Sequence, residues 1–304
     1  MRIVDLTDID VVEGRFGFTG YGSFTWCDPR QAFDPARTGT HRKVFAGPRS
    51  DQAFARIWQP DLGIANGIGP VRITKRVITV RADGRVRIDG LFDAEVAASF
   101  DLRAFPLDEQ VLAIHVESFS WNEDVLQLRE GPRGVAVADG VSIPEWRVVE
   151  ARARVEESRG PKGDVAFSRL LVEVDVAREY GFYVFKVGVP LVLIVVLSWS
   201  VFWMKDEPMA GRIRISSTGV LTIVAFQFAV GGNLPRVPYL TLLDRVMIVS
   251  FMLIAVTVLQ IILVAHYEER DAPRARRIDR ASRWLFPLLY AALLAAVVQL
   301  PHWI

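Results

Sequence analysis

Residues 211–233, GRIRISSTGVLTIVAFQFAVGGN, decide how this chain is organised. As a helix the stretch is long enough to cross a bilayer, which takes about 20 residues. It nevertheless begins with Arg212 and Arg214 and carries several serine and threonine residues. Polar side chains at membrane depth are costly unless they face water or another helix. We therefore expect this helix to line a cavity or a helix interface.

The composition around this stretch predicts two domains. The chain has 304 residues, of which 51% are hydrophobic, and its mean hydropathy of +0.25 is too high for an ordinary soluble protein. Residues 1–179 are rich in Arg, Asp and Glu, whereas residues 180–304 contain long apolar runs. The sequence therefore predicts a water-soluble domain followed by a membrane domain.

Several classes of function are excluded by what the sequence lacks. The net charge is +1 and no run combines basic with aromatic residues, so nucleic acid is not an expected partner. A single cysteine, Cys27, and four scattered histidines predict neither an internal disulfide nor a metal site. The sequence has no nucleophile elbow, no HExxH motif and no phosphate loop, so we expect neither an enzyme nor a cofactor.

Four apolar stretches predict transmembrane helices at about 182–203, 213–230, 242–265 and 284–304. Pro190 in the first is expected to be a tolerated kink. Trp284 and Trp303 stand near the ends of the fourth, where an aromatic belt would place them.

The basic residues of the loops predict the orientation. Residues 205–214 contain three Lys or Arg and residues 266–283 contain six arginines, which places both loops in the cytoplasm. The N-terminal domain and the C-terminus then lie on the periplasmic or extracellular side of the membrane. Export requires a signal, and the first ten residues have no apolar core, so we expect a leader to have been removed.

Residues 1–179 predict an all-β domain. The segments 85–89 and 170–177 alternate apolar and polar residues, as half-buried strands do. Asp83 and Gly84 between two such runs indicate a hairpin turn. We expect an immunoglobulin-like sandwich of roughly 7 to 10 strands.

A β-sandwich followed by four membrane helices has few precedents, and five motifs carry a specific resemblance. They are FTWCDPRQAFDP (24–35), IWQPDL (57–62), RAFPLDEQVL (103–112), GNLPRVPYLT (232–241) and IDRASRWLFP (278–287). In this order the chain resembles the pentameric ligand-gated ion channels, the Cys-loop receptor superfamily, in its bacterial branch. That branch lacks the loop cysteines, whose positions are Ala98 and Leu112 here. The resemblance implies a homopentamer, embedded in membrane lipid, around a central ion-conducting pore.

In that family the second membrane helix lines the pore. Five residues spaced 4, 3, 4 and 3 apart lie on one face of the helix at 213–230. They are Arg214, Thr218, Leu221, Ala225 and Phe228. In a pentamer each becomes a ring, and the Leu221 and Phe228 rings are expected to close the pore by dewetting. The alternative is that the hydroxyls bond their own helix in a tightly packed bundle.

Arg214 bears on ion selectivity. Five copies at the inner mouth would attract anions and repel cations. We expect anion selectivity, and two alternatives remain open. Asp206 and Glu207 nearby would favour cations, or Arg214 would reach the lipid headgroups instead.

The resemblance also implies an agonist site between subunits. Matching the motifs places there Tyr21, Asn66, Glu117, Phe119 and Phe167. Aromatic faces near a carboxylate suit a small amine. The first ligand loop carries no aromatic residue, so a proton as the agonist stays open. The alternative for Phe119 and Phe167 is a place in the sandwich core.

Four further residues are implied to couple the agonist site to the pore. Asp108 and Arg178 correspond to the family's ion pair between the signature loop and the strand before the membrane. Pro235 and Pro238 stiffen the linker that follows the second helix. The main rival hypothesis is a membrane-anchored solute receptor that does not conduct, which would not need a polar heptad stripe.

Overall fold

The computed structural model describes residues 1–138, 140–141, 143–159, 165–204, 208–231 and 237–299. These residues form two compact units. The first comprises Met1–Phe100 and Glu109–Ala177, and the second comprises Asp101–Asp108 and Arg178–Ile304. The loop 101–108 therefore belongs to the same unit as the helices, although it is flanked in sequence by strands.

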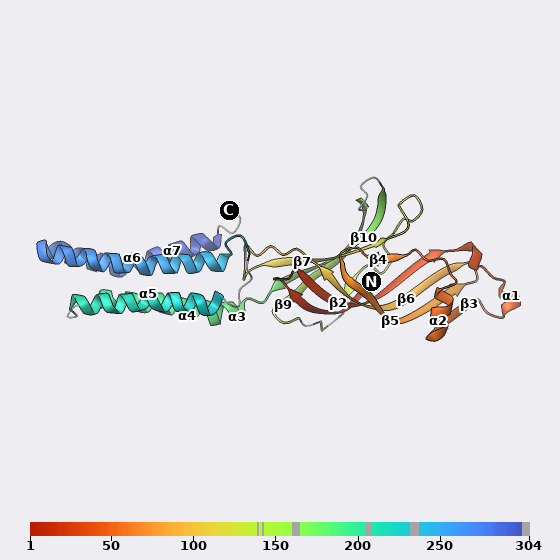
Figure 1. Ribbon diagram of the computed structural model, residues 1–304, viewed down its shortest axis with the longest axis horizontal. Coiled ribbons are helices and arrows are strands. Elements are labelled where there is room, and N and C mark those ends of the chain that lie inside the picture. The colour runs from red at the N-terminus through yellow and green to blue at the C-terminus, as the bar shows by residue number, and fades with distance from the viewer. Residues whose placement is uncertain (139, 142, 160–164, 205–207, 232–236, 300–304) are drawn as a thin grey trace. The chain divides into compact units, whose positions relative to one another are not determined.

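The first unit is a β-sandwich, as predicted (Figure 1). Its described strands are β1 (Arg2–Asp10), β2 (Arg15–Cys27), β3 (Arg42–Ala46), β4 (Leu62–Ile64), β5 (Gly67–Arg81), β6 (Arg85–Ala97), β7 (Glu109–Ser118), β8 (Ala136–Val137), β9 (Trp146–Arg159) and β10 (Ala166–Arg178). One sheet has the order β3-β5-β6-β2-β1-β8, and the other has the order β4-β7-β10-β9.

Alternation along the strands builds the core between the sheets. On β2, Phe16 and Phe18 are buried while the residues between them are not. On β7 and β10, Leu112 and Val174 are fully buried and belong to the same apolar cluster. These residues recur with period two, so one face of each strand packs inward and the other faces outward.

The predicted hairpin is confirmed. β5 and β6 pair antiparallel up to Val80 and Val86, and the turn between them contains Asp83 and Gly84. Gly84 has a φ of 81°, a conformation that glycine adopts without steric cost. Its amide donates to the Arg81 carbonyl at 3.0 Å, which closes the turn.

Short helices lie at one end of the sandwich. They are η1 (Pro29–Gln31), α1 (Pro35–Thr38) and α2 (Pro48–Phe54). Ala53 of α2 packs with Ile78, Val80 and Val86 in a second, smaller apolar cluster. Helix α2 therefore covers part of the larger sheet at this end.

The second unit consists of long helices with short irregular turns. They are α3 (Gly181–Tyr183), the π-helical turn η2 (Val184–Gly188), α4 (Val189–Trp199), the 3-10 turn η3 (Ser200–Trp203), α5 (Met209–Gly231), α6 (Leu242–Arg270) and α7 (Ala272–Gln299). The π-helical turn immediately precedes α4, in which Pro190 is the second residue. Proline has no amide hydrogen for the helix, and a wider turn accommodates that loss.

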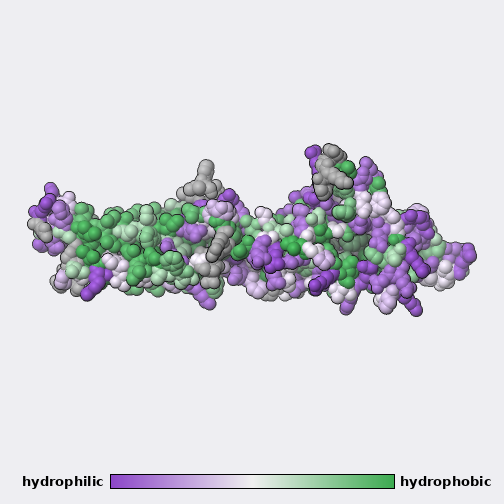
Figure 2. All heavy atoms as spheres, in the orientation of Figure 1, coloured by the Kyte–Doolittle hydropathy of each residue, from purple (hydrophilic) through white to green (hydrophobic). Residues whose placement is uncertain are grey.

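Among the described residues, four helical segments are long and apolar enough to cross a membrane. They are Gly181–Trp203, Ala210–Gly231, Leu242–Glu268 and Ala272–Gln299. Figure 2 shows the hydrophobic surface gathered over these helices and the hydrophilic surface over the sandwich. The chain is a multi-pass membrane protein.

The helices of the last two predicted spans extend beyond the apolar stretches. The third helix continues to Arg270, and the fourth begins at Ala272 rather than near 284. Asp271 alone separates them, so the expected loop 266–283 is mostly helical, and Trp284 lies inside α7. The cause is that hydropathy detects only the length buried in lipid, whereas Arg, Ala and Glu continue a helix into water. Trp303 lies outside the described residues.

Candidate functional site

The predicted stripe of α5 forms one exposed face. Arg214, Thr218 and Ala225 are exposed, Leu221 is 71% exposed and Phe228 is 81% exposed. Ser217 and Thr222 extend the same face. A single chain therefore leaves uncovered a helix face that mixes a cation, hydroxyls and large apolar groups.

The opposite face of α5 packs inside the helical unit. Ile223 and Ser216 are fully buried, and Arg212 is 8% exposed. The Arg212 guanidinium donates to the Asp279 carboxylate of α7 at 2.6 Å and to the Val201 carbonyl at 3.3 Å. The two arginines of the GRIR sequence thus face opposite ways, because residues two apart on a helix do not share a face.

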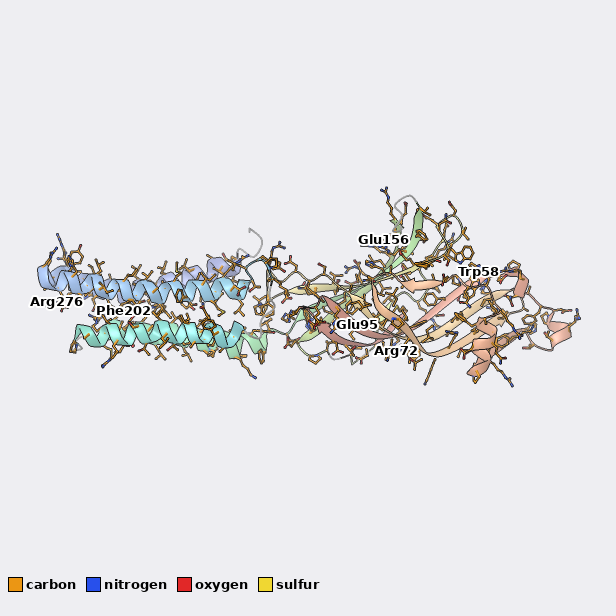
Figure 3. All side chains as sticks on the ribbon, in the orientation of Figure 1. Trp58, Arg72, Glu95, Glu156, Phe202 and Arg276 are labelled. Carbon is orange, nitrogen blue, oxygen red and sulfur yellow. The ribbon has the colours of Figure 1, made fainter. Side chains whose placement is uncertain are left out.

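Asp279 also lies 3.7 Å from the Arg283 guanidinium, which donates to the Phe202 carbonyl at 2.8 Å. The ring of Phe202, which is labelled in Figure 3, packs against that of Phe286 with the centroids 5.0 Å apart. Arg212, Asp279 and Arg283 form what we call the inner triad. Its two cations donate to the carbonyls of Val201 and Phe202 near the end of η3, and the Val201 carbonyl also accepts from the Met204 amide at 3.3 Å. The inner triad therefore joins three membrane helices, and sequence reasoning had missed it.

The hydroxyls of the stripe bond their own helix. Thr218 donates to the Arg214 carbonyl at 2.9 Å, and Thr222 donates to the Thr218 carbonyl at 2.8 Å. Both side chains remain exposed. A hydroxyl that donates to its own backbone still presents its oxygen lone pairs outward. The exposed face thus offers acceptors at Thr218 and a cation at Arg214.

Asp108 and Arg178 form a buried bidentate ion pair. Arg178 Nε lies 2.7 Å from Asp108 Oδ1, and its Nη2 lies 3.1 Å from Oδ2. The two side chains are 3% and 1% exposed. The Arg178 guanidinium also lies over the Phe105 ring at 4.8 Å. A buried ion pair with two hydrogen bonds is costly to break, so this pair holds the loop before β7 to the end of β10.

The loop 101–108 caps the start of α6. The Leu242 amide donates to the Arg103 carbonyl at 2.9 Å, and the Leu243 amide donates to the Phe105 carbonyl at 3.1 Å. Helix N-termini carry amides without intrahelical partners, and this loop supplies the acceptors. The Tyr239 hydroxyl accepts from the Leu102 amide at 3.0 Å. Pro238 is exposed next to Tyr239, and Pro235 lies outside the described residues.

The turn after β7 presents Phe119 outward. Phe119 is 89% exposed, so it is not part of the sandwich core of this chain. Its amide donates to the Asp61 carbonyl at 3.1 Å, and the Ser118 hydroxyl donates to the Pro60 carbonyl at 2.7 Å. The turn is thereby fixed to the segment that precedes β4.

A row of tryptophan rings packs next to this turn. Trp121 donates to the Gln59 carbonyl at 3.3 Å, and its ring lies 5.8 Å from that of Trp58, which is labelled in Figure 3. Trp58 in turn contacts Trp26 at 6.3 Å. The rings were not among the predicted site residues, because no spacing in the sequence links Trp26 to Trp121.

A cavity of about 510 Å³ lies beside this turn. Asn122, Glu123, Asp124 and Gln127 line it on one side, and Val165 and Ala166 on the other. The Glu123 amide donates to the Ala166 carbonyl at 2.9 Å, which holds the two sides together. The half-buried Phe167 follows directly. Sequence reasoning had chosen Phe119 and Phe167 but not the two carboxylates between them, although they follow the SFSWN segment immediately.

Glu117 and Asn66 are each committed to protein partners. Glu117 lies 2.9 Å from Arg169, its cross-strand neighbour on β10. The Asn66 amide nitrogen donates to the Ala97 and Ala113 carbonyls at 3.0 and 2.9 Å. Its oxygen accepts from the His115 amide at 3.0 Å. Asn66 therefore pins the loop between β4 and β5 to two other strands.

Tyr21 faces away from the residues around Phe119. It is 50% exposed on β2, between Gly20 and Gly22, which face the interior. Phe119 follows β7 of the other sheet. One chain therefore does not bring Tyr21 and Phe119 to the same place.

Comparison with known proteins accounts for both units. The neurotransmitter-gated ion-channel ligand binding domain family matches residues 1–180, and the neurotransmitter-gated ion-channel transmembrane region family matches residues 187–275. A proton-gated ion channel of Gloeobacter violaceus is 27% identical over 97% of this chain and 80% of its own length.

Animal receptor subunits match as well. The gamma-aminobutyric acid receptor subunit theta of Mus musculus is 27% identical over 80% of this chain and 39% of its own length. The subunit beta of Lymnaea stagnalis is 24% identical over 92% of this chain and 58% of its own length. The chain thus spans less than two thirds of these animal subunits. The first family model covers the whole sandwich, and the second covers the helical unit from its first span onward. The chain therefore belongs to the neurotransmitter-gated ion-channel family, a family of ligand-gated ion channels and not of enzymes.

Proposed function

We propose that this chain is the subunit of a homopentameric ligand-gated channel whose pore is lined by the exposed stripe of α5. The observation that carries the proposal is the exposure of Arg214, Ser217 and Thr218 on a membrane-spanning helix. Lipid does not accommodate such a face cheaply, so copies of the chain must surround it with water. A solute receptor that does not conduct has no need for this face.

Gating is proposed to occur at the apolar rings. Leu221 and Phe228 are the most exposed apolar residues of the stripe, 71% and 81% in one chain. Five copies of each would narrow the pore with surfaces that water wets poorly. A closed pore of this kind needs no plug, only a small inward movement of α5.

Anion selectivity is proposed from Arg214, which is exposed while Arg212 is neutralised by Asp279. Among the described residues Arg214 has no ion-pair partner, so five Arg214 guanidinium groups would make the field at the inner mouth positive. One observation favours the alternative, a cation-selective channel: Thr218 donates its hydrogen to its own helix and presents its oxygen to the pore. Asp206 and Glu207 lie outside the described residues and bear on the same question.

The agonist is proposed to be a small amine, bound beside Phe119 and Phe167. The cavity lined by the segments that follow Phe119 and precede Phe167 carries Glu123 and Asp124, and a cation suits both carboxylates and aromatic faces. The gamma-aminobutyric acid named in the animal relatives contains an amine. The Gloeobacter relative is named as a proton-gated channel. A proton is therefore the second candidate agonist, and His115, which interacts with several glutamates, is a group that could bind it.

Coupling is proposed to run through Asp108, Arg178 and the loop that caps α6. The loop 101–108 leads directly into β7, and Arg178 ends β10. A ligand that shifts these strands would move the carbonyls of Arg103 and Phe105, and with them the start of α6. Pro235 and Pro238 would stiffen the linker between α5 and α6.

The proposed orientation places the sandwich outside and the α6–α7 turn in the cytoplasm of a bacterial inner membrane. Arg276 and its neighbours cluster at the tip where α6 ends and α7 begins (Figure 3). Arginine-rich short segments remain on the cytoplasmic side.

The decisive experiment is the reversal potential of the purified protein in a planar bilayer with asymmetric KCl, while amines and pH are varied. Current reversing near the chloride potential, and moving toward the potassium potential in Arg214→Gln, supports the anion channel. Arg276→Gln, at the tip of the helices, is the matched control and is expected to leave the potential unchanged. Reversal near the potassium potential in the unmodified protein would select the cation channel, and no current under any condition would favour the non-conducting receptor.

A further inference from the structure

A second cavity, of about 360 Å³, opens at the edge of the six-stranded sheet. It lies where α2 and the turn after it pack beside β3, the last strand of that sheet. The elements α1, α2 and β3 gather at one end of the sandwich (Figure 1). No residue proposed above for the pore, the agonist or the coupling lines this cavity.

Cationic side chains converge on it from three segments. Lys43 comes from β3, Arg49 from α2, and Arg56 from the turn that follows α2. The Lys43 ammonium lies 4.2 Å from the centre of the Phe33 ring, which holds it at the rim. These three residues are what we call the cationic rim.

Carboxylates do not balance the cationic rim. Among the described residues that line the cavity, none is Asp or Glu. The nearby acids are committed elsewhere, because Asp28 bonds Arg30 at 2.7 Å and Asp51 pairs with Arg76 at 3.6 Å. Within the described part of the chain, none of the three rim cations forms an ion pair. Three like charges at one cavity repel one another, and a bound anion would offset that repulsion by attracting all three.

The floor of the cavity is apolar. Phe45 lies two residues beyond Lys43 on the same side of β3, and Val80 is the cross-strand partner of Lys43. Ile57 completes the floor. Val80 is only 3% exposed, so the cavity reaches the small apolar cluster beneath α2. An inorganic anion would leave this surface without a partner, whereas a ligand with an apolar body would cover it.

From the size, the charge and the floor together, we propose that this cavity binds a small organic anion: a carboxylate carried on an apolar body about the size of a single ring. The volume lies at the lower end of the range for small-molecule cavities, roughly 300–1,000 Å³. The carboxylate would meet the cationic rim, and the ring would lie on Phe45, Ile57 and Val80. The proposal is independent of ion conduction.

The test measures binding by isothermal titration calorimetry. The purified full chain is titrated with benzoate and, separately, with its neutral counterpart benzyl alcohol. Benzoate is expected to bind saturably and to weaken as NaCl is raised, because the rim is exposed to screening. Benzyl alcohol is expected to bind at least about tenfold more weakly, a difference of about 1.4 kcal/mol. The double variant Arg49→Gln/Arg56→Gln is expected to lose about the same factor for benzoate.

Arg37→Gln is the matched control, an exposed arginine of α1 that does not line the cavity. It is expected to bind benzoate as the unmodified chain does. If the double variant does not fold, Lys43→Gln provides the same comparison. Equal binding of benzoate and benzyl alcohol, unchanged binding in the rim variants, or no saturable benzoate binding would each overturn the proposal. Full competition by sulfate at the affinity of benzoate would overturn the requirement for an apolar body.

Discussion

At the scale of single residues, the burial of the Asp108–Arg178 ion pair decides how much the pair matters. Motif matching implied that the two side chains are paired but left open whether the pair is buried, and exposed pairs contribute little. Both are buried and doubly bonded. Removing one partner of such a pair leaves the other charge buried without compensation, which is more costly than the pair is stabilising.

We expect Asp108→Asn to impair gating. Asparagine keeps the shape but not the charge, so Arg178 would no longer hold the loop that caps α6. The agonist concentration for half-maximal current should rise by about tenfold or more, equivalent to about 1.4 kcal/mol, with unitary conductance unchanged. Asp89→Asn, which breaks the exposed Arg87–Asp89 pair, is the control. A change in conductance alone would contradict the placement of Asp108 outside the pore.

His115 predicts a pH dependence of stability. Burial lowers the pKa of its imidazole, and the Arg169 guanidinium lowers it further, against the opposing influence of Glu156, Glu117 and Glu173. The unfolded chain therefore takes up a proton at this site at a higher pH than the folded chain does. Stability falls as pH decreases below about 6.5, the ordinary histidine value, because protons favour the unfolded state.

We expect His115→Gln to weaken this dependence. Glutamine does not titrate, so the drop in melting temperature between pH 7.5 and pH 5.5 should be smaller than in the unmodified protein. His41→Gln, on an exposed loop, is the control. An identical drop in the His115 variant would assign the acid sensitivity to other groups.

At the scale of elements, α5 has two faces with different roles. The exposed face carries the stripe, and the buried face carries Arg212 into the inner triad. The triad bonds the end of η3 and the start of α7 to α5. A pore helix held in this way at its inner end is expected to move mainly at its outer end.

Asp279→Asn tests this role of the inner triad. The buried Arg212 and the half-buried Arg283 would lose their shared counterion. We expect channel opening to shift while the ratio of anion to cation permeability stays set by Arg214. The charge-exchanged variant Arg212→Asp/Asp279→Arg should recover part of the loss. A permeability ratio that changes in Asp279→Asn would show that Arg212 contributes to the field in the pore.

Leu221→Ala tests the stripe itself. A smaller apolar ring wets more readily, so we expect activation at about tenfold lower agonist concentration and current in its absence. Val220→Ala, beside it but off the stripe, is the control. An unchanged activation curve for Leu221→Ala would remove this residue from the gate.

At the scale of the whole molecule, the proposed agonist site requires more than one chain. Tyr21 faces outward from one sheet, and Phe119 follows a strand of the other. The exposed polar stripe of α5 imposes the same requirement in the membrane. Both features are explained if copies of the chain surround an axis and each contributes a different face to its neighbour.

Mixed assemblies would test the shared site. Tyr21→Ala and Phe119→Ala should each reduce agonist sensitivity when expressed alone. Co-expression of the two chains should restore part of the response, because some interfaces then combine an intact Tyr21 with an intact Phe119. The expected mass of the assembly is five times 34.1 kDa. Mixed channels no more sensitive than either variant would place the two residues in separate sites.

The sequence by itself determined the elements whose signals are local. Alternation with period two predicted the strands, Asp83 and Gly84 predicted the hairpin, and long apolar runs predicted the membrane spans. These features depend on residues close together in the chain, which one sequence displays directly. The heptad spacing likewise assigned Arg214 and Leu221 to one face of α5.

Only the tertiary structure decided which distant residues meet. No spacing relates Arg212 to Asp279, Trp58 to Trp121, or the carbonyl of Arg103 to the start of α6. The ends of α6 and α7 were also decided there, because helix hydrogen bonds continue past the point where hydropathy falls. Burial depends on how the elements pack, and a buried charge requires a partner. Packing therefore determines that Glu117 pairs with Arg169 while Glu123 and Asp124 line a cavity.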